Sequence, residues 1–498
     1  MSTETKQIVD KAWAFAHVLR EEGLSYLAYT EQITFLLFLK MAHEIAEREP
    51  SRTRLVPKGW GWESLTTKTG PSLKEHYDRL LEKLSRQSGM LGDIFRKPRP
   101  EIENPRTLRR LIVDLIGGEA WTAMDADVKG DIYEGLLART AAESPRGAGQ
   151  YFTPRGLIAA IVDCVHPTIK DTVCDPAAGT GGFLLAAHRF ASRYAGPKHT
   201  RSEREHLTRD FVHGWELVPN TARLCVMNLY LHGVEADPSP LHAGVDSLAE
   251  QPSRRFSVVL TNPPFGKKGS FPVGRKVAGL EEVGESESGV RARPDLWVVT
   301  ANKQLNFLQH VFTLLESGGR CAIVVPDNVL SESGAAEVVR RNLFEQCNVH
   351  TLLRLPPGIF YAQGVKANVL FFDRERPTRR GGLWVYDLRT DKHFTLRQRP
   401  LQRSDLDEFV ECYMPGELGK RRATWNPRKA RGRWRHFDRE LLLSRDKINL
   451  DLTWLKDEEM RSASADLPSS QELAALIAED LRSASEQFQR VAVRLNHQ

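Results

Sequence analysis

The chain is predicted to be an α/β protein with a mostly parallel, doubly wound sheet, preceded by an all-helical region and followed by a helical tail. From Gly149 to about Asp373, short apolar runs typical of buried strands alternate with helical stretches, as in parallel sheets covered by helices. Before that region, apolar residues recur with helical spacing. We therefore expect a helical N-terminal domain at 1–145, a sheet domain at 146–414 and a C-terminal segment at 415–498.

The N-terminal region is expected to consist of several helices. Apolar residues at 8–19 share a helical face, and Thr30 is expected to cap a second helix that runs through Glu47. Further helices are expected at 73–84 and 107–116. No catalytic constellation occurs in this part of the sequence, which suits a dimerisation or docking module.

Composition narrows the class of protein. A chain of 498 residues is too long for one compact core and predicts two or three domains. Its 70 basic and 64 acidic residues give a net charge of +6, which mildly favours nucleic acid as a partner. The six cysteines lack C-x-x-C spacing, so we expect neither a metal site nor disulfides, and a reduced cytoplasmic protein. The longest strongly apolar run, 33–39, is far shorter than the roughly 20 residues that span a bilayer.

The tetrapeptide Asn262-Pro263-Pro264-Phe265 is the most informative motif. It follows a run typical of a buried strand, residues 256–260. The two prolines remove two backbone donors, so the corner offers mainly acceptors, the Asn262 side-chain oxygen and the Pro263 carbonyl. Phe265 adds a flat face for a base. Such a corner suits an amino group that must become nucleophilic, although taken alone it could be only a tight turn.

A second motif lies upstream, between an apolar strand and a helical run. Residues 175–183, with the sequence DPAAGTGGF, combine a sharp glycine turn with the start of a helix. Glycines let a ligand approach the backbone closely, and a helix N-terminus favours a carboxylate or phosphate. A dinucleotide-binding fingerprint would need glycine where Leu184 stands, so NAD is the weaker interpretation.

Two acidic residues follow later apolar runs. Glu216 ends the run 211–215, at the place where a ribose hydroxyl pair is held in this class of fold. Asp246 follows the run 242–245 and could accept from an adenine amino group. The alternatives are a solvated loop charge for Glu216 and an ordinary turn aspartate for Asp246.

With these motifs in this order, the chain resembles the modification subunit of type I restriction-modification systems, which is an S-adenosylmethionine-dependent DNA adenine-N6 methyltransferase. The resemblance covers nearly the whole length and adds the segment Gly149–Arg155, with the sequence GQYFTPR, which would wrap the methionine end of the cofactor. It implies a Rossmann-like methyltransferase sheet and the catalytic residues Asn262, Pro263, Pro264 and Phe265. The cofactor-binding residues that it implies are Gln150, Tyr151, Phe152, Thr153, Pro154, Arg155, Asp175, Ala177, Gly179, Thr180, Gly181, Gly182, Glu216 and Asp246. For Tyr151 and Phe152 alone, core packing before a helix is the alternative.

The motif suggests how an adenine amino group would be activated. If Asn262 and the Pro263 carbonyl each accept one N–H bond, the nitrogen becomes pyramidal and its lone pair can face the sulfonium methyl. The base must first leave the duplex stack, and stacking on Phe265 would offset part of that cost. Phe360, in a loop after a later strand, is expected to wall the base pocket. The stretch 266–294 is expected either to order over the base or DNA or to be a disordered insertion.

The C-terminal part suggests partners. Residues 415–447 contain eleven Lys or Arg and four Asp or Glu, with two interleaved tryptophans, which suits either a phosphate backbone or a solvated or protein-contacting face. Apolar residues at 477–495 recur at four-three spacing, so this helix is expected to pack back or to join a partner. The resemblance implies DNA, a separate specificity subunit serving two modification subunits, and a restriction subunit, since no P-loop is present here.

Two other classes of function remain open. One is a methyltransferase that acts on RNA or on a protein glutamine amide, because the same corner suits any planar amino group. Such enzymes are generally smaller and lack the long helical N-terminal region and the terminal apolar stripe. The other is a non-catalytic scaffold that keeps a cofactor-binding fold, against which the intact tetrapeptide argues.

Overall fold

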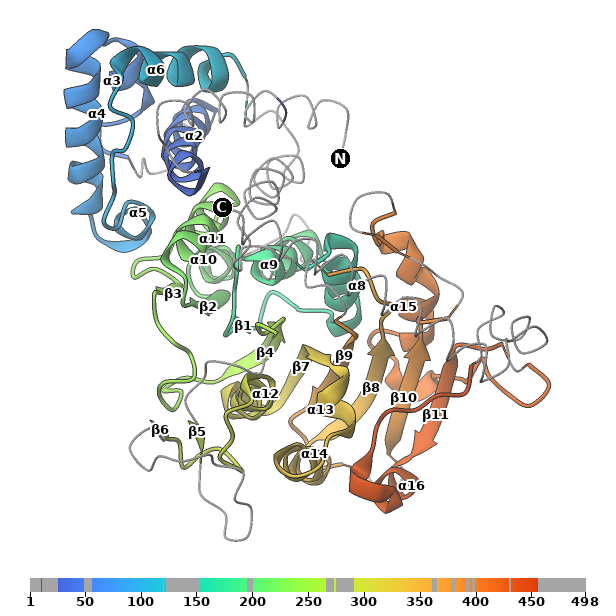
Figure 1. The fold of residues 1–498 in the computed structure, drawn as a ribbon. Coiled ribbons are helices and arrows are strands. Elements are labelled where there is room, and N and C mark those ends of the chain that lie inside the picture. Colours follow the sequence, from blue (N-terminus) through green and yellow to red (C-terminus); the bar gives the residue numbers. More distant parts are fainter. Residues whose placement is uncertain are drawn as a thin grey trace, which may run out of the picture. The chain divides into compact units, whose positions relative to one another are not determined.

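A computed structural model provides the fold of the chain (Figure 1). The chain divides into a large unit, residues 1–389 and 393–452, and a small unit, residues 390–392 and 453–498. All elements named below belong to the large unit. The residues that the structure describes are 10, 26–48, 56–119, 121, 153–194, 200–265, 273–274, 291–360, 365–377, 381–390, 394–395, 399–429 and 431–455.

The described N-terminal part is helical, as predicted. Its elements are α2 (Tyr26–Arg48), α3 (Trp62–Thr66), α4 (Gly70–Ser85), α5 (Gly89–Ile94), α6 (Pro105–Arg110) and the π-helical η1 (Leu111–Gly117). The helices expected at 73–84 and 107–116 fall within α4 and within α6 with η1, whereas the expected first helix lies outside the described residues. The expected cap at Thr30 is wrong, because α2 already includes Tyr26. The helix includes residues before Thr30 because Ala28 and Tyr29 are buried and their packing stabilises it there.

A sheet of nine strands forms the centre of the large unit. The strands are β1 (Val173–Asp175), β2 (Val212–Glu216), β3 (Leu241–Ala243), β4 (Phe256–Thr261), β7 (Leu315–Pro326), β8 (Asn348–Arg354), β9 (Ala367–Asp373), β10 (Gly382–Asp387) and β11 (Trp434–Asp438). Their order is β11-β10-β8-β9-β7-β4-β1-β2-β3, and only β9 and β11 pair antiparallel to their neighbours. A separate pair, β5 (Val273–Gly274) and β6 (Arg291–Ala292), is parallel. The predicted mostly parallel sheet is confirmed.

Helices cover both faces of this sheet, as expected for a doubly wound fold. One face carries α8 (Arg155–Val165), α9 (Gly182–Tyr194), α11 (Pro219–Leu231) and α15 (Asp407–Tyr413), and the other carries α12 (Lys303–Leu314), α14 (Ala335–Gln346) and α16 (Arg439–Ser444) (Figure 1). Shorter elements are α10 (Arg201–Arg209), α13 (Asp327–Ser331), η4 (Arg403–Leu406), η5 (Leu418–Lys420) and η6 (Asp446–Ile448). The strands are mainly apolar because both of their faces are buried.

The N-terminal helices and the sheet region share one apolar core. At their junction, Arg223 on α11 donates one hydrogen bond to Glu31 on α2 at 2.6 Å and another to the Arg96 carbonyl at 2.9 Å. Nearby, the rings of Phe38 and Tyr230 lie 5.6 Å apart. Burial lowers the pKa of the Arg223 guanidinium, and Glu31 partly counters that effect. A buried arginine is tolerable only with such partners, so this junction is specific as well as apolar.

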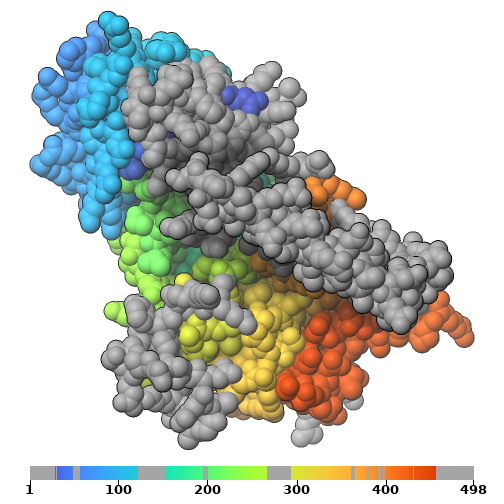
Figure 2. Space-filling model, in the orientation of Figure 1, coloured from blue at the N-terminus to red at the C-terminus, as the bar shows by residue number. Residues whose placement is uncertain are grey.

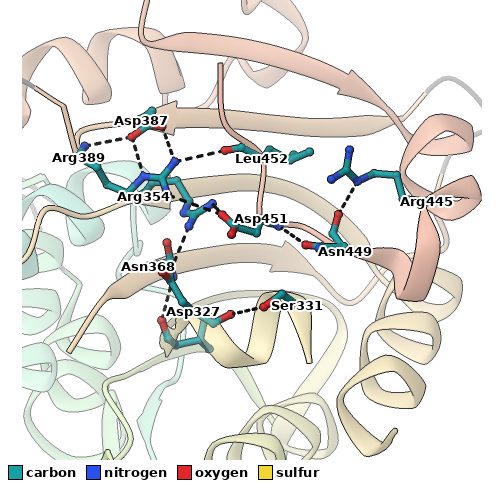
Figure 3. A network of polar contacts seen from close by, with 11 residues as sticks. Asp327, Ser331, Arg354, Asn368, Asp387, Arg389, Arg445, Asn449, Asp451 and Leu452 are labelled. Atoms are coloured by element: carbon teal, nitrogen blue, oxygen red, sulfur yellow. Dashed lines mark hydrogen bonds and ion pairs between the residues drawn. The ribbon is translucent and has the colours of Figure 1, made fainter. Parts of the chain in front are cut away.

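Parallel strands bring the residues that follow their carboxyl ends to one edge of the sheet. On the β7 to β10 side, that edge carries a network of paired charges (Figure 3). Arg354, which is fully buried, donates to Asp451 at 2.9 Å and to Asp327 at 3.2 Å. Asn368 also donates to Asp327, and Arg389 pairs with the carboxylate of Asp387. Arg354 and Arg389 are therefore neutralised by neighbouring carboxylates, while the β4-β1-β2 side carries a cavity.

The cysteines of the chain are all free thiols. Five of the six are buried, and Cys412 is half-buried. Among the described helices, none is long and apolar enough to cross a membrane. Within the same described ranges, no group of three His, Cys, Asp or Glu side chains is placed to hold a metal ion.

Candidate active site

A glycine turn joins β1 to α9 and begins the site. Gly179 and Gly181 have φ angles of +55° and +86°, which residues other than glycine rarely adopt. A Cβ at Gly181 would also lie 2.9 Å from the Cys225 sulfur on α11. The turn is held in place because the Ala178 N–H donates to the Trp215 carbonyl on β2 at 2.9 Å. The sequence therefore needs glycine here both for backbone conformation and for close packing.

Asp175 ends β1 beneath this turn and is almost fully buried. Burial raises the pKa of its carboxyl to about 7, and the negative charge of Glu216 adds to this effect. The Ala177 N–H donates to Asp175 Oδ1 at 3.0 Å, and this hydrogen bond works in the opposite direction. With a pKa of about 7, the Asp175 carboxyl is close to half-protonated at neutral pH and would ionise readily beside a positive charge.

Glu216 ends β2 and is buried, which excludes the solvated loop charge considered as an alternative. Its two carboxylate oxygens accept from the Gly179 N–H at 2.9 Å and from the Val218 N–H at 2.8 Å. Burial raises the pKa of Glu216, and these backbone donors oppose the rise. Because a carboxylate offers about four acceptor positions, roughly two remain for ligand hydroxyls.

Asp246 lies in a turn after β3, where its side chain accepts from the Leu248 N–H at 3.1 Å. Its carbonyl accepts from the Ala249 N–H at 3.0 Å. This is the geometry of the turn aspartate that the sequence left open as an alternative. A contact between Asp246 and adenine stays a prediction.

A small cavity, partly open to solvent, lies above the glycine turn. It combines residues from three predicted motifs, namely Thr153, the turn that follows β1, and Asn262. The lining residues are Thr153, Ile158, Asp175, Ala177, Ala178, Gly179, Thr180, Gly182, Phe183 and Asn262. The sequence motifs did not point to Ile158, although helical spacing from Pro154 puts it one turn into α8, where its side chain packs against Gly182.

Asn262, directly after β4, makes the most informative interaction of the site. Its Nδ2 donates to the Thr153 hydroxyl at 2.9 Å. Its Oδ1 is buried and has no hydrogen-bond partner among the described residues. An unpaired buried acceptor costs about 1–3 kcal/mol, so its presence beside a cavity points to a donor that arrives with a ligand.

The remainder of the tetrapeptide is also held by neighbours. Gln304, buried on α12, donates from Nε2 to the Pro264 carbonyl at 3.4 Å. The rings of Phe265 and Phe360 meet edge to face, with centroids 5.5 Å apart and an interplanar angle of 72°. The expected proximity of Phe360 to the corner is therefore confirmed, whereas its contact with a base stays a prediction. Sequence reasoning missed Gln304, because a single glutamine in a helix carries no signal.

Some predicted residues lie elsewhere. Pro154 precedes α8, where its carbonyl accepts from Leu157 and Ile158, and Arg155 begins that helix. Gln150, Tyr151 and Phe152 lie outside the described residues, as do most of the stretch 266–294 and the helix expected at 477–495. For these residues the cofactor, loop and partner roles remain predictions.

Sequence comparison with known proteins identifies the family of the chain. A model of the N-6 DNA methylase family matches residues 124–425, and a model of the HsdM N-terminal domain matches residues 8–115. The methylase subunit of the type I restriction enzyme StySJI from Salmonella typhimurium is 35% identical over 94% of this chain and 91% of its own length. The chain belongs to the N-6 DNA methylase family. As a type I modification subunit, this N-6 DNA methylase transfers methyl groups to N6 of adenine in DNA.

Solved structures agree with the sequence comparison. The M protein of the EcoKI restriction enzyme matches 95% of this N-6 DNA methylase, and 96% of its own chain, with 30% identity and a TM-score of 0.53. A chain from a structure of the complex assembly and conformational transition of the type I system matches 99% of both chains, with 26% identity and a TM-score of 0.67. The expected family, methyltransferase fold and DNA-adenine activity are thus confirmed.

Proposed function

We propose that S-adenosylmethionine binds in the cavity beside the glycine turn, as the methyltransferase family implies. The residues present fit this molecule. Buried Asp175 and Glu216 offer acceptors and negative charge to a cation that carries ribose hydroxyls, and the N-terminus of α9 at Gly182 suits its carboxylate. When bound, S-adenosylmethionine supplies an electrophilic methyl group on a sulfonium. Thr153 and Asn262 line the same cavity, so the acceptor corner would lie beside that methyl group.

We further propose that Asn262 Oδ1 accepts an N–H bond from the amino group of a flipped adenine. The supporting observation is the bond from Nδ2 to Thr153, together with an Oδ1 that is buried and unpaired among the described residues. A second acceptor, the Pro263 carbonyl, would hold the other N–H, so that the nitrogen lone pair turns toward the methyl group. Phe265, supported by Phe360, would stack on the base and offset part of the cost of flipping.

We propose the partners of this chain from the family resemblance, which is supported by relatives named as methylase subunits of type I restriction enzymes. DNA is the substrate, a specificity subunit reads the sequence, two modification subunits serve each specificity subunit, and a restriction subunit joins the full complex in the cytoplasm. The helix predicted at 477–495 would contact the specificity subunit. If so, removal of residues 470–498 should abolish co-purification of the specificity subunit while leaving S-adenosylmethionine binding unchanged. Intact complex formation by the truncated chain would contradict this assignment.

The central test is labelled methyl transfer to unmodified duplex DNA by the complex purified from its native cells. Asn262→Ala is expected to bind S-adenosylmethionine normally and to lose about 10²–10³-fold in rate, by analogy with the removal of one preorganised polar group. Label on RNA or on protein glutamine would favour the first alternative class, and cofactor binding without any transfer would favour a scaffold. Full activity of Asn262→Ala would refute the proposed role of the corner.

A further inference from the structure

The segment 420–433 is a compact, strongly basic hairpin, which we call the basic hairpin. Its sequence, KRRATWNPRKARGR, contains seven Lys or Arg and no acidic residue. The backbone N–H groups of Thr424 and Trp425 both donate to the Trp434 carbonyl, at 3.0 and 3.1 Å. A Cβ at Gly432 would lie 2.3 Å from the Thr424 backbone, so glycine lets the two arms approach. Residue 430 lies outside the described part.

Several of these cations anchor the hairpin to the fold. Arg421 is buried, donates to the Tyr413 carbonyl at 2.8 Å and lies 4.4 Å from the Tyr413 ring centroid. Arg433 donates to the Asp387 carbonyl at 2.8 Å. Lys420 pairs with Glu417. These interactions fix the base of the hairpin, so its tip is presented in a defined place.

The tip carries exposed cations. Asn426 Oδ1 accepts from the N–H groups of Arg428 and Lys429, both at 2.9 Å, which holds the turn in shape. The side chains of Arg422, Arg428, Lys429 and Arg431 are exposed. Figure 2 shows the orange-to-red segment that includes the hairpin on the surface of the molecule. A preordered group of arginines and lysines without acids suits the regularly spaced phosphates of a nucleic acid.

Strand register places the basic hairpin on the same edge of the sheet as the catalytic corner. The relevant pairs, stepping from β4 to β11, are Thr261 with Ile323, Val325 with Asn368, Asn368 with Arg354, Arg354 with Asp387, and the Asp387 N–H with the Arg433 carbonyl. Five steps between strands at about 4.8 Å each span about 24 Å. The base of the hairpin at Arg433 therefore stands about 24 Å from Asn262 along the carboxyl edge, and the tip extends beyond that base.

The stretch of edge between them offers no comparable concentration of positive charge among the described residues. Arg354 pairs there with Asp327 and Asp451, and Arg389 pairs with Asp387 (Figure 3). Because carboxylates pair with these arginines, the arginines contribute little positive electrostatic potential at the surface. A polyanion that lies along this edge would pass the paired arginines and then contact the hairpin, whose tip carries exposed cations.

We propose that the basic hairpin binds the phosphate backbone of the same duplex whose adenine is flipped toward Asn262. At 3.4 Å per base pair, about 24 Å corresponds to a position about seven base pairs from the target. The interaction is independent of sequence, since arginine and lysine at phosphates position a duplex without reading bases. The inference rests on the proposed docking of adenine at Asn262 and extends it to the path of the DNA.

The test uses the complex with its specificity subunit and the triple variant Arg422→Gln, Arg428→Gln, Lys429→Gln. The logarithm of the DNA-binding constant falls linearly with the logarithm of the salt concentration, and each phosphate ion pair that the substitutions remove should reduce this salt slope by about 0.9. A fourfold rise in salt should therefore weaken DNA binding by the wild type up to about 40-fold more than DNA binding by the variant. The duplex should extend about twelve base pairs beyond the target in one substrate and about four in the other, so that the two lengths bracket the expected seven. The shorter duplex should bind the wild type more weakly and should bind the variant as tightly as the longer one does. The matched control is Lys170→Gln, Arg255→Gln, Arg376→Gln, three exposed cations at the opposite edge of the sheet.

Three outcomes decide the proposal. Equal salt slopes and equal length dependence for wild type and variant would overturn it, as would an equal effect of the control variant. Failure of the hairpin variant to assemble would also overturn it, assigning the hairpin to an acidic surface of a protein partner. Methyl transfer at saturating DNA and low salt should be unchanged in the variant. Absence of transfer by the wild type itself would instead refute the proposed function.

Discussion

Replacement of Thr153 by valine tests whether the orientation of Asn262 governs catalysis. The Thr153 hydroxyl accepts a hydrogen bond from Asn262 Nδ2 at 2.9 Å. Valine keeps the shape of threonine and removes that acceptor. The Asn262 amide then loses its preference for presenting Oδ1 to the cavity, because neither orientation satisfies a buried partner.

The magnitude follows from the cost of an unpaired buried donor. The bond to Thr153 can favour the productive orientation by at most about 1–3 kcal/mol, so its loss lowers kcat/KM by at most about 5- to 150-fold. This is smaller than the loss expected for Asn262→Ala, because the oxygen itself is retained. Thr153→Ser keeps the hydroxyl and is expected to keep most of the activity.

The assay is methyl transfer under saturating S-adenosylmethionine, with cofactor affinity measured separately because Thr153 also lines the cavity. A double-mutant cycle distinguishes positioning from a direct role. If Thr153 acts through Asn262, valine at 153 should cause little further loss in the Asn262→Ala background. Additive losses, or wild-type kinetics for Thr153→Val alone, would refute the reasoning.

Three further predictions concern stability. Because burial raises the pKa of Asp175 to about 7, the contribution of Asp175 to the free energy of unfolding should fall as pH rises from about 4 to about 7. Urea melts should therefore show Asp175→Asn gaining stability relative to wild type over that range, and a constant difference would contradict this. Arg354→Met should lower the free energy of unfolding by about 1–3 kcal/mol. This loss is smaller than the loss expected on breaking a fully buried ion pair, because Asp327 and Asp451 are partly exposed and can be hydrated. An unchanged urea midpoint would show that the network adds no stability. Gly181→Ala should cost about 1–3 kcal/mol in the same melts and weaken S-adenosylmethionine binding, since a Cβ would meet Cys225 at a φ of +86°; unchanged melting would argue against the tight turn.

Most of the candidate site could be predicted because its residues follow strands. Asp175, Glu216 and Asn262 each end or follow an apolar run, and parallel strands deliver such positions to one edge. The glycine turn could be recognised from its composition. The order of the strands, with β9 inserted antiparallel between β7 and β8, required the structure, because pairing between distant strands leaves no local pattern.

The features that the sequence did not predict depend on tertiary packing. Gln304 reaches the Pro264 carbonyl from forty residues away, and nothing in its neighbours marks it as different from a surface glutamine. Thr30 looked like a helix cap by residue type, but packing of the preceding residues extended the helix. Likewise, the basic composition of 415–447 could not distinguish Arg421, which is buried, from Arg428, which is exposed.

The bond between Glu31 and Arg223 has a consequence for how this protein responds to heat and to shortening. Because the helices that precede residue 118 and the helix α11 share one core, calorimetry should detect one cooperative melting transition for both. A shortened protein that began at the sheet region would expose Tyr230 and leave Arg223 without Glu31. Such a fragment should aggregate rather than serve as a minimal methylase, so the N-terminal helices act as part of the folding unit and not as a removable attachment.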